Sequence, residues 1–147
     1  MEKQEIITTI DSAIKRRYER FDRLFVKVKG VGFEKADDGL YRYEKSVTDE
    51  ARRIAVYFVE KGGSWEELWK KLYEGCSDSY DFVQNLIKDG YTGWWEGHSG
   101  NSGSAAVHFA RCLLSRPDLF EYLHGALSPL VGDAGYYDDR SDLPKDL

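Results

Sequence analysis

The chain has 147 residues, of which 41% are hydrophobic and 32% charged, the size and composition of one globular domain rather than a disordered chain. Its net charge of −5 is opposite in sign to the basic excess of most nucleic-acid-binding proteins, so we expect no nucleic acid partner. No apolar run approaches the roughly 20 residues that a membrane-spanning helix needs, so we expect no membrane partner.

The N-terminal segment, MEKQEIITTI, has no basic region followed by an apolar stretch, so we expect no secretory signal peptide. The two cysteines, Cys76 and Cys112, form neither a CxxC pair nor a disulfide framework. We therefore expect a soluble protein with free thiols in a reducing, cytoplasmic compartment. Cys112 lies in an apolar stretch and should react slowly, whereas Cys76 should be accessible.

Residues 4–25 are predicted to form the first helix, because Ile7, Ile10, Ile14 and other apolar residues recur near the helical period. Its other side carries a basic stripe, which consists of Arg16, Arg20, Arg23 and Lys27. Two interpretations stay open. The stripe is either a solvated face with local ion pairs or a docking face for an acidic partner, the chain's own C-terminal tail included.

Residues 26–45 are predicted to form a two-stranded β-hairpin. The runs VKVKGVGFE and LYRYE alternate between apolar and polar residues, and Asp38-Gly39 lies at the bend between them. Two strands alone are only marginally stable in water. The hairpin is therefore expected to pack on helices or to pair across an oligomer interface.

Thr48 is predicted to cap a helix over residues 49–61. Asp49 and Glu50 would then suit the positive N-terminal end of that helix, and Gly62-Gly63 would stop it.

Two short helices follow. A capping box at Ser64–Glu67 opens the first of them, which ends at Gly75. Ser77 or Ser79 is predicted to start the second, which ends at Asp89-Gly90.

A helix over residues 104–114 is apolar on nearly every side, which predicts the central helix of the fold. Its polar residues fall on one face, which points either to water or into a cleft. They are Ser104, His108, Arg111 and Ser115. Ser115 should cap a last helix with Pro117 in its first turn.

The predicted fold is thus a single, mainly α domain of about six short helices, with the hairpin of residues 26–45 inserted between the first and second helices. The globular part spans residues 1–132. Residues 133–147 are predicted to form an acidic, partly mobile tail. The region from Pro117 onward has seven acidic and two basic residues, whereas residues 1–30 have eight basic and five acidic ones.

The segment GYTGWWEGHSGNSG, from Gly90 to Gly103, precedes the predicted central helix. It carries five of the 14 glycines and two of the four tryptophans, a composition suited to close backbone approach and aromatic contact. Unpaired N–H groups at the helix start could bind an anion. We therefore predict a recognition site made of Trp94, Trp95, His98, Ser99, Asn101, Ser102, Ser104, His108 and Arg111.

Three alternatives remain for this segment. It could be purely structural, with its Ser and Asn side chains capping the helix. Tyr91 and the two tryptophans could form a protein-contact patch. An enzyme is the third possibility, in which Glu96 and His98 supply acid–base or hydrolytic chemistry on a polar or anionic small molecule in a cleft.

Specific catalytic and metal motifs are absent from the sequence. The run Gly97-His98-Ser99-Gly100 is followed by Asn101 where the nucleophile elbow G-x-S-x-G requires glycine. The histidines have no spacing typical of a metal site, so we predict no metal and no cofactor. The leading hypothesis is a small binding protein of unknown pathway. We expect a homodimer that binds a protein partner or a small polar or anionic ligand.

Overall fold

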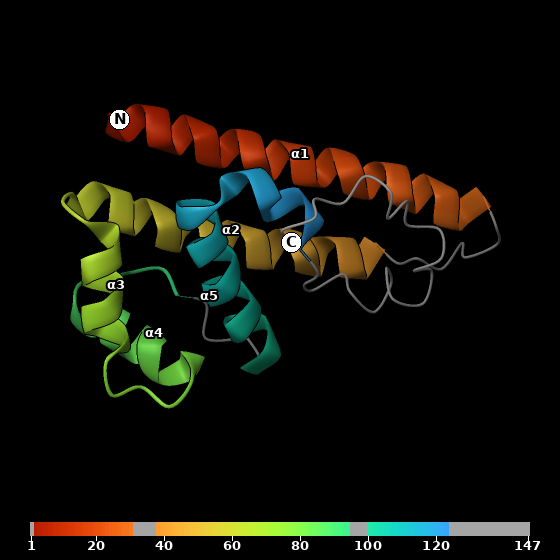
Figure 1. Cartoon of the computed structure of the whole chain (residues 1–147). Coiled ribbons are helices and arrows are strands. Elements are labelled where there is room, and N and C mark those ends of the chain that lie inside the picture. Colours follow the sequence, from red (N-terminus) through yellow and green to blue (C-terminus); the bar gives the residue numbers. More distant parts are fainter. Residues whose placement is uncertain (1, 31–37, 95–99, 124–147) are drawn as a thin grey trace.

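The computed structural model describes the backbone of residues 2–30, 38–94 and 100–123, and the side chains of residues 2–20, 45–94 and 103–123. The described part is helical and contains no β-strand (Figure 1). In chain order its elements are α1 (Lys3–Gly30), α2 (Asp38–Lys61), α3 (Trp65–Tyr73), α4 (Ser79–Lys88), α5 (Gly100–Ser115) and the 3-10 helix η1 (Pro117–Tyr122). The expectation of a mainly helical chain with about six helices is confirmed.

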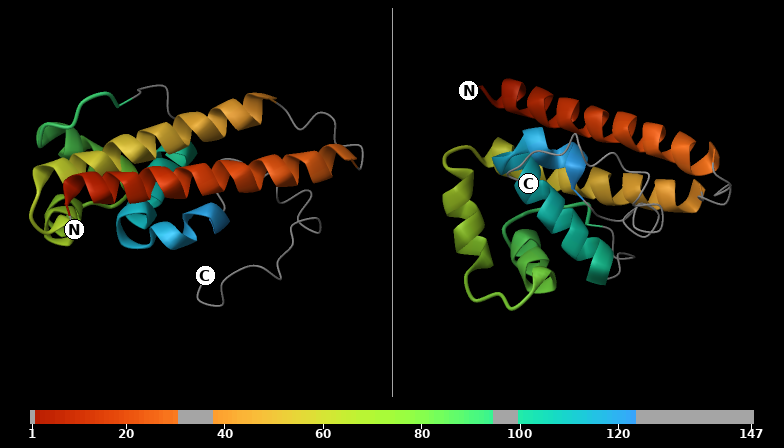
Figure 2. Two further views of the ribbon diagram at one scale, coloured as in Figure 1. Left: turned by 90° about the horizontal axis from the view of Figure 1, so that it is seen from above. Right: turned by 45° about the vertical axis from the view of Figure 1, so that its right-hand side comes forward.

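The helices α1 and α2 are the longest elements and lie side by side (Figures 1 and 2). They run in opposite directions, since Lys3 at the start of α1 donates from Nζ to the carbonyl oxygen of Glu60 near the end of α2, at 3.0 Å. The chain then turns into α3 and α4, and α5 returns to pack mainly on α2. Helices α3, α5 and η1 therefore pack on the two long helices, whereas α4 packs mainly on α3 and α5.

The predicted β-hairpin over residues 26–45 is wrong. The residues up to Gly30 continue α1, and those from Asp38 onward belong to α2, while residues 31–37 lie outside the described residues. Alternation over four or five residues does not by itself distinguish a strand from a helix. Two long antiparallel helices can bury apolar side chains against each other, whereas an isolated hairpin gains little.

The predicted start of the second helix is also wrong, because Thr48 is a fully buried residue inside α2 rather than its cap. The fully buried positions of this helix begin upstream of the predicted start and recur near the helical period. They include Val47, Ala51, Ile54, Ala55 and Phe58. Because the helix begins at Asp38, Val47 belongs to this buried face of α2. A helix capped by Thr48 would not have contained Val47.

Several predicted helix boundaries are confirmed, namely the end of α2, the start of α3 and the end of α4. Gly62 and Gly63 follow α2 with φ angles of 76° and 70°, which confirms the predicted stop. Ser64 is the N-cap of α3, and its hydroxyl accepts a hydrogen bond from the backbone N–H of Glu67 at 3.3 Å. At the end of α4, Asp89 is the C-cap and Gly90 has a φ of 115°, also as predicted.

The start of α4 differs from the prediction, because Asp78 is the N-cap in place of Ser77 or Ser79. Its carboxylate accepts from the backbone N–H of Asp81 at 3.0 Å. Ser77 instead donates its hydroxyl to the Asp81 carboxylate at 2.8 Å, which lowers the pKa of Asp81. Asp and Ser are about equally good caps, so their order in the chain could not identify the capping residue.

The helix α5 is the central helix, as predicted. Ala106, Phe109, Ala110 and Leu113 are at most 1% exposed, and the helix packs on α1, α2, α4 and η1. Aromatic rings extend this core toward α3: the ring centroids of Trp69 and Phe82 lie 4.6 Å apart, and those of Trp69 and Phe58 lie 5.0 Å apart. The buried hydrophobic side chains of all these helices form one cluster.

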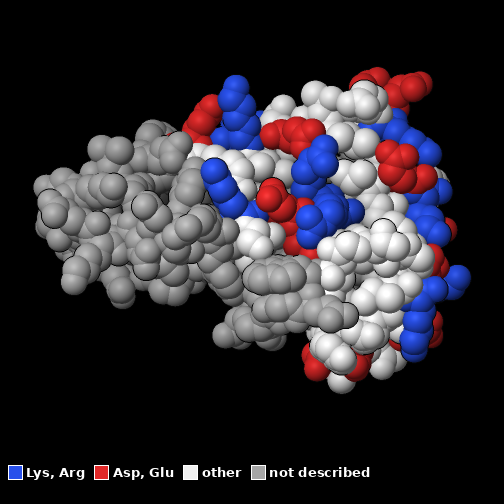
Figure 3. Space-filling view, turned by 180° about the vertical axis from the view of Figure 1, so that it is seen from behind, with Lys and Arg blue, Asp and Glu red and all other residues white. Residues whose placement is uncertain are grey.

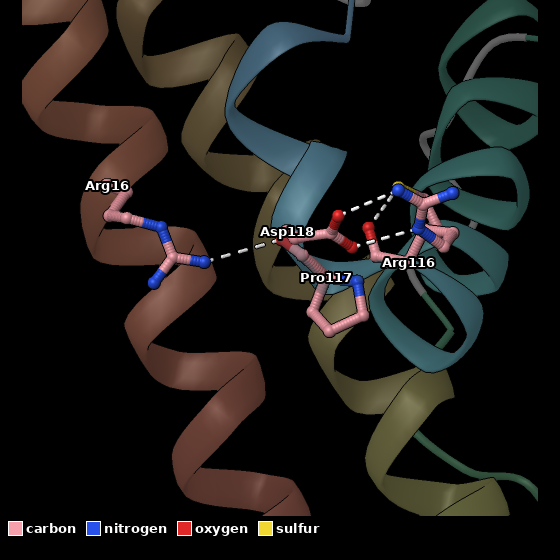
Figure 4. Close-up of polar contacts among 5 residues, drawn as sticks. Arg16, Arg116, Pro117 and Asp118 are labelled. Atoms are coloured by element: carbon pink, nitrogen blue, oxygen red, sulfur yellow. Dashed lines mark hydrogen bonds and ion pairs between the residues drawn. The ribbon is translucent and has the colours of Figure 1, made fainter. Parts of the chain in front are cut away.

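The last described element, η1, is held against α1 by polar contacts (Figure 4). Arg16 of α1 contacts the Glu121 carboxylate at 3.2 Å and the carbonyl oxygen of Pro117 at 3.4 Å. Arg116 pairs with Asp118 at 2.8 Å, at the junction between α5 and η1. The predicted cap, Ser115, instead donates its hydroxyl to the carbonyl oxygen of Arg111 at 2.7 Å, and Arg116 is the N-cap of η1.

Arg17 is fully buried, and sequence patterning did not distinguish it from the basic residues around it. Its Nη1 donates to the carbonyl oxygens of Phe120 and Leu123, both at 2.7 Å. Its guanidinium carbon lies 4.4 Å and 4.9 Å from the ring centroids of Phe109 and Phe120. A buried cation with ring faces and carbonyl oxygens around it joins α1, α5 and η1 at one point.

Part of the predicted basic stripe is not a solvated face. Arg20 is only 5% exposed, and its guanidinium lies 4.9 Å from the ring centroid of Tyr122. Together with the Arg16–Glu121 pair, this contact shows that residues of η1 cover this part of the stripe. The side chains of Arg23 and Lys27, and the acidic tail at residues 133–147, lie outside the described residues.

Both cysteines are free and partly buried. Burial raises the pKa of the Cys112 thiol to about 11, so at pH 8 the reactive thiolate is scarce and grows only as the pH approaches that value. In a titration of the folded protein with a thiol reagent at pH 8, we expect Cys112 to react at least about tenfold more slowly than the unfolded chain. A Cys112→Ser variant that leaves the slow phase unchanged would contradict this assignment.

Candidate functional site

The structure describes only part of the predicted recognition segment. Trp95, Glu96, His98 and Ser99 lie outside the described residues, as do the side chains of Asn101 and Ser102. Among the predicted site residues, those with described side chains are Trp94, Ser104, His108 and Arg111. The expected convergence of His98 with the residues of α5 therefore stays untested.

The predicted loop is shorter than expected, because α5 already begins at Gly100 rather than at Ser104. Gly103 is buried in the first turns of this helix, and a Cβ atom added there would lie 3.5 Å from the ring of Trp94. Trp94 is partly buried against the core. Gly103, the last residue of the segment GYTGWWEGHSGNSG, thus lies against the tryptophan ring, an approach that the lack of a side chain permits.

The start of the segment is anchored by a polar cluster around the buried carboxylate of Glu50, whose partners are Arg53 of α2, which is exposed, and Tyr91, which is buried. The carboxylate of Glu50 is fully buried and accepts from Arg53 through both oxygens, at 2.8 Å and 3.3 Å. The hydroxyl of Tyr91 donates to the same carboxylate. Burial is the main cause that raises the pKa of Tyr91, and the Glu50 carboxylate adds to it, so the phenol stays protonated.

Sequence analysis missed this cluster. It assigned Glu50 to the first turn of a helix, because it began α2 after Thr48. The available signal was spacing, since Glu50 lies three residues after Val47 and four before Ile54, on the apolar stripe itself. A carboxylate at such a position needs partners to remain charged. Gly93, with a φ of 90°, brings the backbone close to Arg53 as well.

The polar stripe of α5 is confirmed as one exposed face. Ser104, His108, Arg111 and Ser115 are all exposed. Arg111 differs from the other arginines with described side chains, because each of those has an ion pair, a hydrogen bond or a ring contact. Among the described contacts, the Arg111 guanidinium has none of these.

Arg111 borders a pocket of about 470 Å³ between α3 and α5. The rest of the pocket lining comes from one face of α3. It consists of Trp65, Glu66, Trp69, Lys70, Tyr73 and Glu74. Trp69 is 5% exposed and Tyr73 is 39% exposed, so the aromatic side chains pass from the core to the surface along this face. His108 does not line this pocket.

A second pocket of about 460 Å³ lies where the start of α1 meets the end of α2 and the end of α5. Its lining is mostly apolar and includes Phe58, Trp65 and Leu113. Lys3 lies at its edge, where the ammonium group donates to the carbonyl oxygen of Glu60. The ammonium group of Lys3 therefore already has a hydrogen-bond partner, whereas the guanidinium of Arg111 at the first pocket has none among the described contacts.

Charged side chains of both signs are interleaved across the described part of the face opposite to Figure 1 (Figure 3). Among the described residues, no group of three or more His, Cys, Asp or Glu side chains has an arrangement suited to a metal ion. None of the described helices combines the length and the apolar character needed to cross a bilayer. The chain matches no protein-family model, no curated protein and no solved structure.

Proposed function

We propose that this chain is a small cytoplasmic binding protein that acts as a homodimer. It recognises a partner protein or a small polar or anionic ligand through the 91–104 segment and the exposed face of α5. The observation that carries the proposal is the row formed by Ser104, His108 and Arg111. These polar side chains are exposed along one face of a helix whose other faces are buried in the core.

A rigid base under this surface supports binding. Tyr91, at the start of the segment, is tied to Glu50 and Arg53 of α2, and Trp94 packs over Gly103 of α5. Groups that are already held in place lose little conformational entropy when a ligand arrives. The enclosed Glu50 carboxylate therefore positions Tyr91 and Arg53, whereas Glu96 and His98, which the enzyme alternative uses, lie outside the described residues.

The recognition surface can be tested by native mass spectrometry of the protein purified from the cells that make it. We expect the ions of the protein to carry additional mass from a retained ligand or partner. His108→Glu should reduce the retained fraction at least about tenfold, because it introduces a carboxylate into the exposed polar row of α5. The bare protein mass in the wild-type sample would contradict the proposal.

Lys88→Glu provides the control for that experiment. Lys88 is exposed on α4, away from the polar stripe, and the substitution also introduces a carboxylate. Retention should be the same as in the wild-type protein. If Lys88→Glu and His108→Glu reduce retention equally, the ligand is bound by general electrostatics and not by the face of α5.

A further inference from the structure

The pocket between α3 and α5 has charges of both signs at its edge. Glu66, Lys70 and Glu74 succeed one another at a spacing of four residues on α3, and Arg111 faces them from α5. Side chains four residues apart on a helix can form ion pairs. Within the described structure, however, none of these four side chains is ion-paired with another.

The floor of this pocket is aromatic and is only partly covered. Trp65, Trp69 and Tyr73 also lie four residues apart on α3, and the ring centroids of the two tryptophans are 6.3 Å apart. In the described part of the chain, three large hydrophobic side chains are exposed, namely Tyr73, Tyr80 and Ile87. All three belong to α3 and α4, which pack against each other, and Tyr73 is the one that lines this pocket.

We propose that this pocket is where two copies of the chain meet, with Arg111 of each copy against Glu74 of the other. This proposal rests on the homodimer that forms part of the proposed function. A two-fold interface places the same surface on both sides, so it uses each complementary contact twice. The two cations and two carboxylates cancel locally, which allows two chains of net charge −5 to approach at this surface.

The same charges argue against a small anion as the occupant, because Glu66 and Glu74 would repel it. Glu74 is a better partner for Arg111 than Glu66 is, since the Glu66 carboxylate already accepts from the hydroxyl of Ser64 at 3.1 Å. The aromatic side chains would lie at the centre of the contact and contribute most of its affinity, and the ion pairs would set its geometry. A stable dimer needs about 1,000 Å² or more of total buried surface.

The test uses two charge reversals, Arg111→Glu and Glu74→Arg, in the full chain. Each variant alone places like charges opposite each other twice, and we expect its dimer to weaken at least about tenfold. Mixed in equal amounts, the variants restore both opposite-charge contacts. In sedimentation at micromolar concentration, the wild type and the mixture should therefore run near twice 16.9 kDa, or about 34 kDa, and each variant alone near 16.9 kDa.

Lys71→Glu and Glu60→Arg serve as matched controls, since both residues are exposed and neither lines the pocket. Both control variants should remain dimeric. Far-ultraviolet circular dichroism of all variants should match that of the wild type, because every substituted residue is exposed.

The outcomes separate the two proposals. A wild-type protein that sediments near 16.9 kDa at both low and moderate salt would overturn the homodimer and with it the interface. A wild-type dimer that persists in both single variants would overturn only the interface proposed here. Single variants that are monomeric and stay monomeric when mixed would overturn the pairing of Arg111 with Glu74.

Discussion

Replacing Glu50 by alanine is expected to lower the free energy of unfolding by about 1–3 kcal/mol. The substitution leaves the hydroxyl of Tyr91, a 4% exposed residue, without its acceptor and removes the carboxylate that pairs with Arg53. Arg53 is 45% exposed and can pair with water instead, so most of the loss comes from the Tyr91 hydroxyl, which stays desolvated without its acceptor. Urea unfolding followed by tryptophan fluorescence measures the change.

The exposed pair between Arg52 and Asp11 is the control for this prediction. Its charged atoms are 2.6 Å apart, but the two side chains are 41% and 48% exposed. Asp11→Ala should therefore change the free energy of unfolding by no more than about 1 kcal/mol. Glu50→Gln keeps an acceptor for Tyr91 and should be less destabilising than Glu50→Ala. A loss below about 1 kcal/mol in Glu50→Ala would show that the cluster does not stabilise the fold.

Replacing Arg17 by methionine is expected to detach η1 from α1 and to lower the free energy of unfolding by about 3 kcal/mol or more. Methionine keeps an apolar stem but loses the donors to the carbonyl oxygens of Phe120 and Leu123. Hydrogen bonds from a charged group contribute about 1.5–3 kcal/mol each, and the contacts with the rings of Phe109 and Phe120 are lost as well.

Amide hydrogen exchange locates the effect of Arg17→Met. The amides from Leu119 to Leu123 should exchange at least about tenfold faster, while those of α2 keep their relative protection. Arg16→Met is the matched control, because Arg16 is 43% exposed and its ion pair with Glu121 should contribute no more than about 1 kcal/mol. Equal effects of the two substitutions would mean that burial of the Arg17 guanidinium is unimportant for the position of η1.

Some features of the candidate site could be predicted and others could not. The exposed face of α5 followed from the spacing of Ser104, His108 and Arg111, because a helix repeats every 3.6 residues. The pocket beside Arg111 could not be predicted, since its other residues come from α3, which precedes α5 by more than 20 residues in the chain. No pattern within the sequence of either helix shows which of its faces will contact the other helix in the folded protein.

Short-range patterns in the amino-acid sequence were enough to predict where most helices stop and which face of α5 is polar. Those features depend on neighbouring residues, such as Gly62-Gly63 after α2 and the Ser64 hydroxyl on the N–H of Glu67. Only tertiary packing determines that residues 26–30 and 38–45 extend two helices, and that Arg17 and Glu50 are buried. A segment with an ambiguous pattern forms a helix or a strand according to which arrangement buries more apolar surface. A charged side chain is buried only where groups distant in the sequence form hydrogen bonds or ion pairs with it.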